Sequence, residues 1–265
     1  MRSLPLRGLF ATFAAGVLPM CSQREAVVAD VVSLGESTGL ENALPPASPP
    51  CPGDMVLIEG NFCPDVEEKC LRWMDPPGRY HEFRCAEYAP SVCKGARRHM
   101  RYCIERTEHV DRAKEDGRPQ NFLSFEDSER TCKSLGARVC RESEWVFACE
   151  GEEMRPYPYG QKRDSSACNV DRATDLGRKG ALVDHRIAAG SMSTCQSSFG
   201  VFDQAGNLEE WVASDPGDVA KMGWKNVLKG SWWIPSRHHC RGFQIGHDTR
   251  YKGAETGTRC CKDAD

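Results

Sequence analysis

Fifteen cysteines in a chain of 265 residues constrain the fold more than any other feature of the sequence. A reduced compartment rarely holds so many cysteines unless they bind metal, and the chain has no CxxC pairs combined with histidines at zinc-site spacing. The cysteine content therefore favours an exported protein with disulfide bonds. Setting Cys21 aside leaves fourteen cysteines, an even number that fits seven disulfides in one domain. An odd free thiol is the alternative.

The first fifty residues are typical of an export signal followed by a linker. Two arginines precede an apolar run that ends at Met20, which predicts a signal peptide over residues 1–20. Cys21 follows directly, as in lipoprotein signals whose cysteine is acylated, and ordinary cleavage before Asp30 is the alternative. Residues 21–50, rich in proline and alanine, predict a tether. We therefore expect a periplasmic or cell-envelope lipoprotein, or a secreted protein, that meets a membrane only through this lipid anchor.

The charge pattern excludes nucleic acid as a partner. The net charge is −3, and the basic clusters are too short to follow a phosphate backbone. Residues 51–265 are enough for one domain with a substantial core.

Two helices are predicted in the middle of the chain. Ser124 and Asp127, in the sequence SFED, are close to a capping box at a helix start. A second helix is expected over Glu142–Cys149, with Trp145 facing inward. Beyond Gly151 the density of glycine, proline and aspartate rises, which favours short strands and long loops. The pattern predicts an irregular, loop-rich α+β domain.

The stretch FGVFDQAGNLEEW, residues 199–211, predicts a tight turn bearing oxygen ligands. Gly206 and Asn207 tolerate left-handed backbone angles, so carbonyl groups can converge there. Asp203 and Glu210 flank the turn, and clustered hard oxygens suit calcium. A turn with solvated carboxylates would have the same sequence pattern.

The same stretch resembles the segment GLYDMAGNVWEW of the formylglycine-generating enzyme family, also called sulfatase-modifying factor proteins. Six further segments are similar to motifs of this family in the same order. They are DMVLIEGNF (54–62), YCIERTEHV (102–110), residues 122–151, YPYG (157–160), LKGSWW (228–233) and TGTRC (256–260).

The resemblance implies one disulfide-stapled α+β domain of the sulfatase-modifying-factor type, a C-type-lectin-like variant, over residues 51–265. Within it, residues 63–103 are predicted to be a cysteine-rich insertion, because the part from Cys63 to Cys93 departs from the family pattern. Such an insertion could tighten the fold or carry recognition. The resemblance also implies the disulfides Cys132–Cys260 and Cys149–Cys240, each contributing on the order of 4 kcal/mol on the chain-entropy model.

The catalytic chemistry of the family depends on two cysteines shortly after the GGS motif, which bind copper and oxidise a sulfatase cysteine to formylglycine. In this chain Ile234 and His239 stand at those two positions, and Glu209 replaces a pocket tryptophan. We therefore expect no formylglycine generation and neither copper nor iron. The candidates that remain for any catalysis are Ser231, His239 and Cys240.

Calcium ligands of the family also have counterparts here. The resemblance implies one site with the Asp203 and Glu210 carboxylates and two backbone carbonyls, and a second site earlier in the chain. The residues are Asp203, Gly206, Leu208 and Glu210 for the one, and Asn169, Val170, Asp184 and Arg186 for the other. Calcium would be structural in both.

Three functions compete on these grounds. The first is an exported, calcium-stabilised binding or envelope module, a pseudoenzyme with a protein, peptide or glycan partner. The second is a metal-dependent oxidoreductase that uses His238, His239 or Cys240 on a peptide or secreted metabolite. The third is a lectin-like carbohydrate binder, by analogy of fold.

Overall fold

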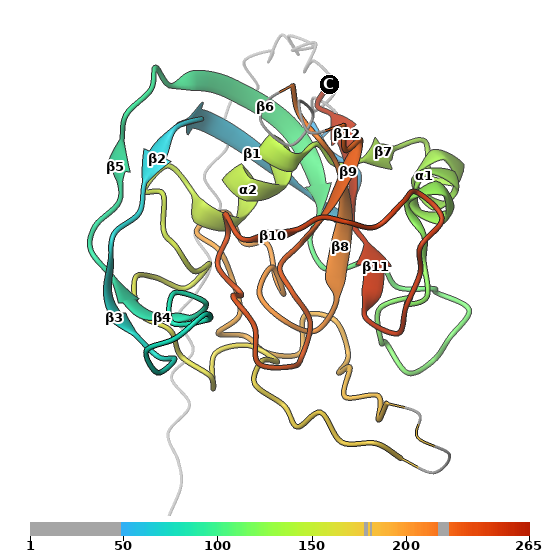
Figure 1. Ribbon diagram of the computed structural model, residues 1–265. Helices are drawn as coiled ribbons and strands as arrows, with labels where there is room; N and C mark the ends of the chain where they lie inside the picture. The colour runs from blue at the N-terminus through green and yellow to red at the C-terminus, as the bar shows by residue number, and fades with distance from the viewer. Residues whose placement is uncertain (1–48, 178–179, 181, 217–222) are drawn as a thin grey trace, which may run out of the picture. The chain divides into compact units, whose positions relative to one another are not determined.

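The computed structural model describes residues 49–177, 180, 182–216 and 223–265 (Figure 1). The predicted signal peptide, Cys21 and nearly all of the tether lie outside these residues. Within the described residues, no helix is long and apolar enough to cross a membrane.

Two four-stranded sheets form the framework of the domain (Figure 1). The first is antiparallel, in the order β1-β6-β12-β7. The second has the order β10-β9-β8-β11, and β11 runs parallel to β8. The strands of the first sheet are β1 (Met55–Phe62), β6 (Arg98–Glu105), β7 (Arg138–Val139) and β12 (Cys260–Asp263). Those of the second are β8 (Glu209–Ala213), β9 (Asn226–Lys229), β10 (Phe243–Gln244) and β11 (Thr256–Thr258).

Both predicted helices are present. α1 (Phe125–Ser134) begins at the capping box that the sequence predicts, in which Ser124 and Asp127 bond to each other's backbone N–H groups. α2 (Glu142–Glu150) is one residue longer than predicted. Its residues from Ser143 to Glu150 are all buried, because the helix packs against β6 of one sheet and β8 of the other.

The main core fills the space around α2. Phe147 of the helix packs with residues from the first sheet, such as Ile58 and Ile104, and with Val212 and Val227 of the second. The described chain between α2 and β8 contains neither helices nor strands and is held by turns. The predicted irregular α+β fold is therefore confirmed.

Seven disulfides join the fourteen cysteines of the described residues. Four of the bridges lie at Cys132–Cys260, Cys140–Cys261, Cys149–Cys240 and Cys168–Cys195. The other three are Cys51–Cys103, Cys63–Cys93 and Cys70–Cys85. The seven bridges include Cys132–Cys260 and Cys149–Cys240, the two pairs that the resemblance implies. The neighbours Cys260 and Cys261 fasten β12 to α1 and to the segment before α2, respectively.

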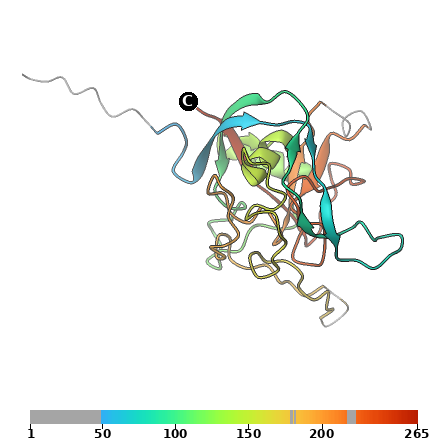
Figure 2. The same ribbon diagram turned by 90° about the vertical axis from the view of Figure 1, so that its left-hand side faces the viewer.

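Part of the predicted insertion, residues 98–103, lies in β6, which pairs with β1 and β12 in the main sheet. We call the part before β6, residues 63–97, the added segment. The added segment forms two small pairs, β2 (Val66–Glu67) with β5 (Val92–Cys93) and β3 (Cys70–Trp73) with β4 (Cys85–Tyr88). We call the β3–β4 hairpin, residues 70–88, the flap. It projects from the side of the domain (Figure 2).

The disulfides should differ in their effect on stability. Replacing Cys132 and Cys260 together by serine is expected to lower the free energy of unfolding by about 5 kcal/mol, because the bridge closes a loop between residues 128 apart. The same change at Cys70 and Cys85, which are 15 apart, should cost about 3 kcal/mol. Denaturant titration of both variants under oxidising conditions measures the difference. Equal losses would contradict the loop-length argument.

Candidate functional site

The turn before β8 adopts the strained backbone that its sequence predicts. Asp203, Gly206 and Asn207 have positive φ angles of 60°, 82° and 58°. A Cβ atom on Gly206 would come within 2.3 Å of the Asn169 carbonyl oxygen. Glycine is therefore required at this position, and it lets the turn pack directly against the segment that contains Asn169.

A buried ion pair holds the end of this turn. The Glu210 carboxylate accepts hydrogen bonds from Arg259 at 2.8 and 2.9 Å and from the Trp145 indole at 2.7 Å. The Arg259 guanidinium also donates to the carbonyls of Glu105 and Phe202. Both charged side chains are fully buried. The pair therefore connects β8, the end of β6 and α2 at one point.

Glu108 belongs to the same cluster, although the sequence analysis did not single it out. Its carboxylate accepts hydrogen bonds from the Leu208 backbone N–H at 2.9 Å and from the Asn207 side chain at 2.6 Å. Burial, reinforced by the charges of Asp203 and Glu210, raises the pKa of Glu108 well above its usual range. Its place in the motif YCIERTEHV was the signal that could have found it.

Asp203 carries negative charge that little in its surroundings balances. Its Oδ2 accepts a hydrogen bond from the Gly190 N–H at 2.5 Å. Burial raises its pKa to about 6. Glu108, Asp203 and Glu210 are thus three buried carboxylates around one buried cation, Arg259.

The two sets of predicted calcium ligands lie against each other. The Asn169 carbonyl accepts a hydrogen bond from the Asn207 N–H, and its side chain donates to Asn207 and to the His185 carbonyl. Asp184, by contrast, pairs with Arg186 at 2.8 Å and Arg118 at 3.4 Å. In the Asp203 set, Glu210 is already bonded to Arg259 and Trp145, so the oxygens that could hold calcium are those of Asp203 and of the two backbone carbonyls. In the Asp184 set the carboxylate is already paired with two arginines.

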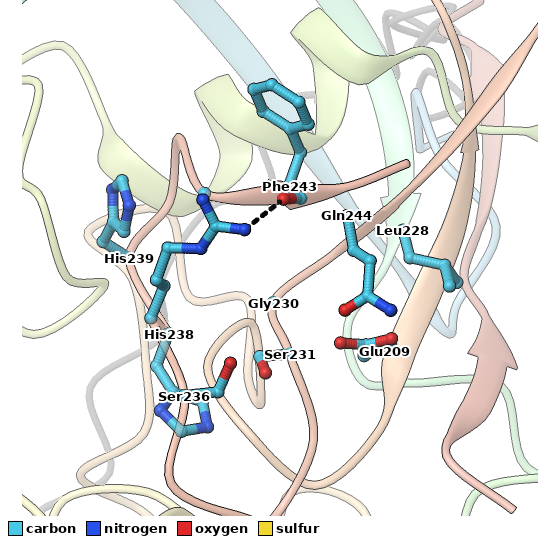
Figure 3. Close-up of a pocket in the computed structure, with 11 residues that line it drawn as sticks. Glu209, Leu228, Gly230, Ser231, Ser236, His238, His239, Phe243 and Gln244 are labelled. Atoms are coloured by element: carbon cyan, nitrogen blue, oxygen red, sulfur yellow. Dashed lines mark hydrogen bonds between the residues drawn. The ribbon is translucent and has the colours of Figure 1, made fainter. Parts of the chain in front are cut away.

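A narrow pocket of about 20 Å³ is lined by two of the predicted catalytic candidates, Ser231 and His239 (Figure 3). Glu209, Ser231, His238 and His239 are among its lining residues. Burial, together with the negative charge of Glu255, raises the pKa of Glu209 to about 8. The position of the family tryptophan thus holds a carboxyl group that is largely protonated at neutral pH.

The adjacent histidines of this pocket have different surroundings. His238 is buried, with Nδ1 2.9 Å from Arg163 and Nε2 2.7 Å from the Trp232 carbonyl. Burial and the Arg163 charge lower its pKa to about 4, so the neutral ring uses both nitrogens. His239 instead lies 3.4 Å from a carboxylate oxygen of Glu68. The two histidines do not converge on one point, as expected for neighbours in an extended segment.

The structure removes Cys240 from the catalytic candidates. Its sulfur is bonded to that of Cys149, so it offers no thiol to the pocket. Ile234, at the position of the family's first catalytic cysteine, is half-buried. Among the described residues, no free cysteine reaches the pocket.

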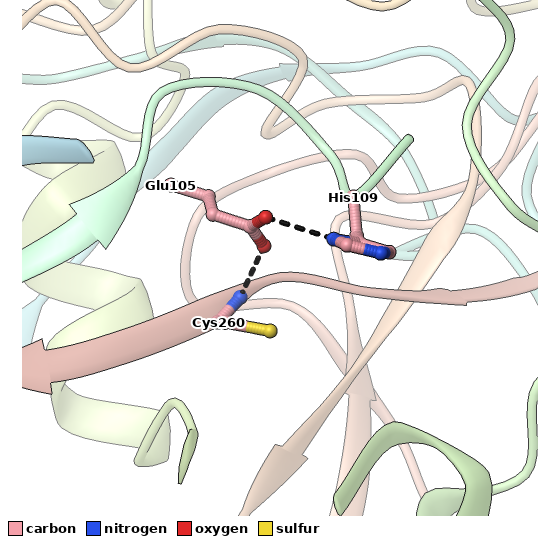
Figure 4. A group of neighbouring side chains, drawn as sticks. All are labelled: Glu105, His109 and Cys260. Carbon is pink, nitrogen blue, oxygen red and sulfur yellow. Dashed lines mark hydrogen bonds and ion pairs between the residues drawn. The ribbon is translucent and has the colours of Figure 1, made fainter. Parts of the chain in front are cut away.

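A second cluster, Glu105, His109 and Cys260, brings potential metal ligands together (Figure 4). The Glu105 carboxylate lies 2.8 Å from His109 Nδ1 and accepts a hydrogen bond from the Cys260 N–H at 2.7 Å. The Cys260 sulfur is bonded to Cys132 and is not a thiolate. The cluster therefore joins β6 to β12 and has no sulfur ligand to offer.

Comparison with known proteins identifies related chains. Residues 72–264 match the sulfatase-modifying factor enzyme 1-like domain. Over 154 residues, 55% of this chain, the sequence is 27% identical to inactive C-alpha-formylglycine-generating enzyme 2 of Bos taurus, of which the match covers 50%. The mouse (Mus musculus) protein of that name is 26% identical over 154 residues, covering 55% of this chain and 49% of the relative. The chain spans about half the length of these curated relatives.

A solved structure supports the fold. The crystal structure of CarF superposes with a TM-score of 0.52 and 16% identity, over 81% of this chain and 99% of that chain. At this identity the similarity concerns the fold alone.

Glu209 should make stability depend on pH. Its pKa is raised in the folded state from 4.5 to about 8, so its contribution is fully present below pH 4.5 and is lost as the pH rises through about 8. Glu209→Gln should remove this loss. The free energy of unfolding of Glu209→Gln minus that of the parent should therefore increase by on the order of 1 kcal/mol per pH unit between about pH 5 and 8.

Denaturant titrations across this pH range measure the effect. Glu129→Gln, at an exposed position of α1, is the matched control and should leave the profile unchanged. If the stability of Glu209→Gln varied with pH in parallel with that of the parent, the Glu209 carboxyl group would not change its pKa from 4.5 to about 8 on folding.

Proposed function

The chain belongs to the sulfatase-modifying factor enzyme 1-like family, and from this premise we propose that it generates no formylglycine and acts as an exported, calcium-stabilised binding or envelope module. The observation that carries the proposal is the state of the cysteines. Seven disulfides use all fourteen cysteines of the described residues, and none of them is left as a thiol.

The pocket chemistry supports the loss of catalysis. Monovalent copper prefers soft thiolate ligands, and the two family positions hold Ile234 and His239. Cys240, one residue further on, is bonded to Cys149. The bovine and mouse relatives carry the word inactive in their names, which agrees with the proposal.

The flap is where we place the surface that binds a protein or peptide partner. It exposes large apolar side chains on a segment held by the Cys70–Cys85 bridge, and an exposed apolar patch on a rigid loop is typical of an interaction site. The exposed residues are Leu71, Met74, Tyr80 and Phe83.

Calcium would bind at the Asp203 set and would be structural. The carboxylate of Asp203 would supply charge, and the carbonyls of Gly206 and Leu208 would supply neutral oxygens. Support comes from Asp203, whose buried carboxylate accepts one backbone hydrogen bond and forms no ion pair in the described residues, because a cation there would stabilise its charged form. The seven disulfides support export.

An oxygen-consumption assay tests the catalytic part of this proposal. The protein, loaded with copper and given a sulfatase-motif peptide, is expected to consume no oxygen and to leave the peptide cysteine unmodified, because no thiolate pair can hold the copper. An active enzyme of the family is the positive control. Turnover would refute the proposal, and turnover lost on His239→Ala would favour a metal-dependent oxidoreductase with non-standard ligands.

Thermal unfolding with and without calcium tests the structural metal. Calcium at about a hundred times its dissociation constant should add about 2.7 kcal/mol to the free energy of unfolding relative to chelator. Asp203→Asn should abolish the shift, whereas Asp65→Asn, at an exposed position of the added segment, should keep it. An unchanged calcium response in Asp203→Asn would show that the ion binds elsewhere.

A further inference from the structure

A larger cavity of about 590 Å³ lies at the N-terminal end of α2. We call it the α2 cavity. Its lining residues come from β1, β6, α2, β9, β10 and the loops beside them, and it shares only Phe243 with the narrow pocket around Ser231. Its volume is within the range of sites that enclose small molecules. It is therefore a separate site from the narrow pocket.

The wall of the α2 cavity combines apolar and cationic groups. The ring of Phe62 has two guanidinium groups over it, that of Arg98 at 5.3 Å and that of Arg241 at 5.6 Å from its centroid. Val146 and Phe243 add further apolar surface. Phe62 is only 4% exposed and its ring is covered by these groups, whereas Phe243 is 36% exposed. Phe243 therefore offers the surface on which a ligand with an apolar or aromatic body would lie.

Lys229 brings a buried amine to this wall. Its side chain is 1% exposed, and among the described residues its ion-pair partner is Glu142, whose Oε1 lies 3.5 Å from Nζ. The amine otherwise faces the rings of Trp145 and Phe243, at 5.7 and 5.9 Å from their centroids. An ammonium group has three donors, and a buried donor without an acceptor is costly. Lys229 therefore has donor capacity that the described part of the chain does not use.

Ser143, in the first turn of α2, also lines the cavity and lacks a partner. Its Oγ is buried and makes no hydrogen bond in the described part of the chain, and the residue is 7% exposed. Its backbone N–H is already used, because it donates to Asp215 at 2.6 Å. A second unsatisfied polar group thus lies in the same cavity, where buried polar groups are normally paired.

The remaining charges of the cavity decide what kind of ligand fits. Arg241 is neutralised by a bidentate pair with Glu150, at 2.7 and 2.8 Å. Arg98 lines the cavity without an ion pair in the described residues, and Lys229 and Ser143 are left as buried hydrogen-bond donors. These three groups call for an acceptor. Glu142 and Asp215 also line the cavity, so a doubly charged anion such as a phosphate monoester would be repelled more than a single carboxylate.

We propose that the α2 cavity binds a small carboxylic acid with an apolar or aromatic body, whose carboxylate is held by Lys229 and Ser143 and whose body lies against Phe243. Binding of this ligand uses neither the proposed calcium ligands nor the polar groups of the narrow pocket. It gives this chain a small-molecule site in addition to the surface on the flap.

Two probes of the same shape test the charge requirement. The full exported domain is titrated by calorimetry with naphthalene-2-carboxylate and with the uncharged naphthalene-2-carboxamide. The carboxylate is expected to bind at least tenfold more tightly than the amide. Lys229→Met should remove this preference, and Lys225→Met, which changes an exposed lysine just before β9, should retain it.

A second variant keeps the test decisive if Lys229→Met does not fold. Ser143→Ala removes one hydroxyl group without altering charge, and it should weaken carboxylate binding several-fold while circular dichroism shows an unchanged fold. Three outcomes would overturn the proposal: equal affinity for the two probes, full affinity in both variants, or no saturable binding at millimolar concentration. Formylglycine turnover, which would refute the proposed function, would leave these results unaffected, because none of the substituted residues lines the narrow pocket.

Discussion

The ion pair between Arg259 and Glu210 is the interaction on which the rest of the structure depends. It lies in the core, and each partner also bonds to groups from other elements, so removing either one would leave an unpaired buried charge at a cost of about 3–5 kcal/mol. Arg259 is followed directly by Cys260 and Cys261, which are both bridged. One short segment thus combines an electrostatic and a covalent attachment, and the two sheets and α2 are positioned around it.

The same ion pair leaves a surplus of negative charge beside it. Glu108 is held by the turn through Asn207 and the Leu208 N–H, and Asp203 receives one backbone donor. Such an arrangement is stable when the carboxyl groups are protonated or when a cation is present, as the raised pKa values of Glu108 and Asp203 indicate. The turn that identifies the family in the sequence is therefore also the part of the core whose charge state depends on its surroundings.

Local features of the fold could be predicted from the sequence, and long-range ones only partly. The capping box at Ser124 depends on four consecutive residues, so it was predicted correctly. The bridges Cys140–Cys261 and Cys168–Cys195 could not be assigned, because cysteine spacing does not determine connectivity. Glu108 accepts a hydrogen bond from the backbone N–H of Leu208, which lies 100 residues later in the chain. No local sequence pattern marks that contact.

The neighbouring bridges of Cys260 and Cys261 also fix an order of events during oxidative folding. Their partners lie 128 and 121 residues earlier, so both bonds close loops that span nearly half of the chain. Cys70 and Cys85, 15 residues apart, meet when a much shorter loop closes. The flap is thus able to oxidise early, whereas these core cysteines stay reduced for longer. Incorrect pairs that form in that interval are corrected only by thiol–disulfide exchange.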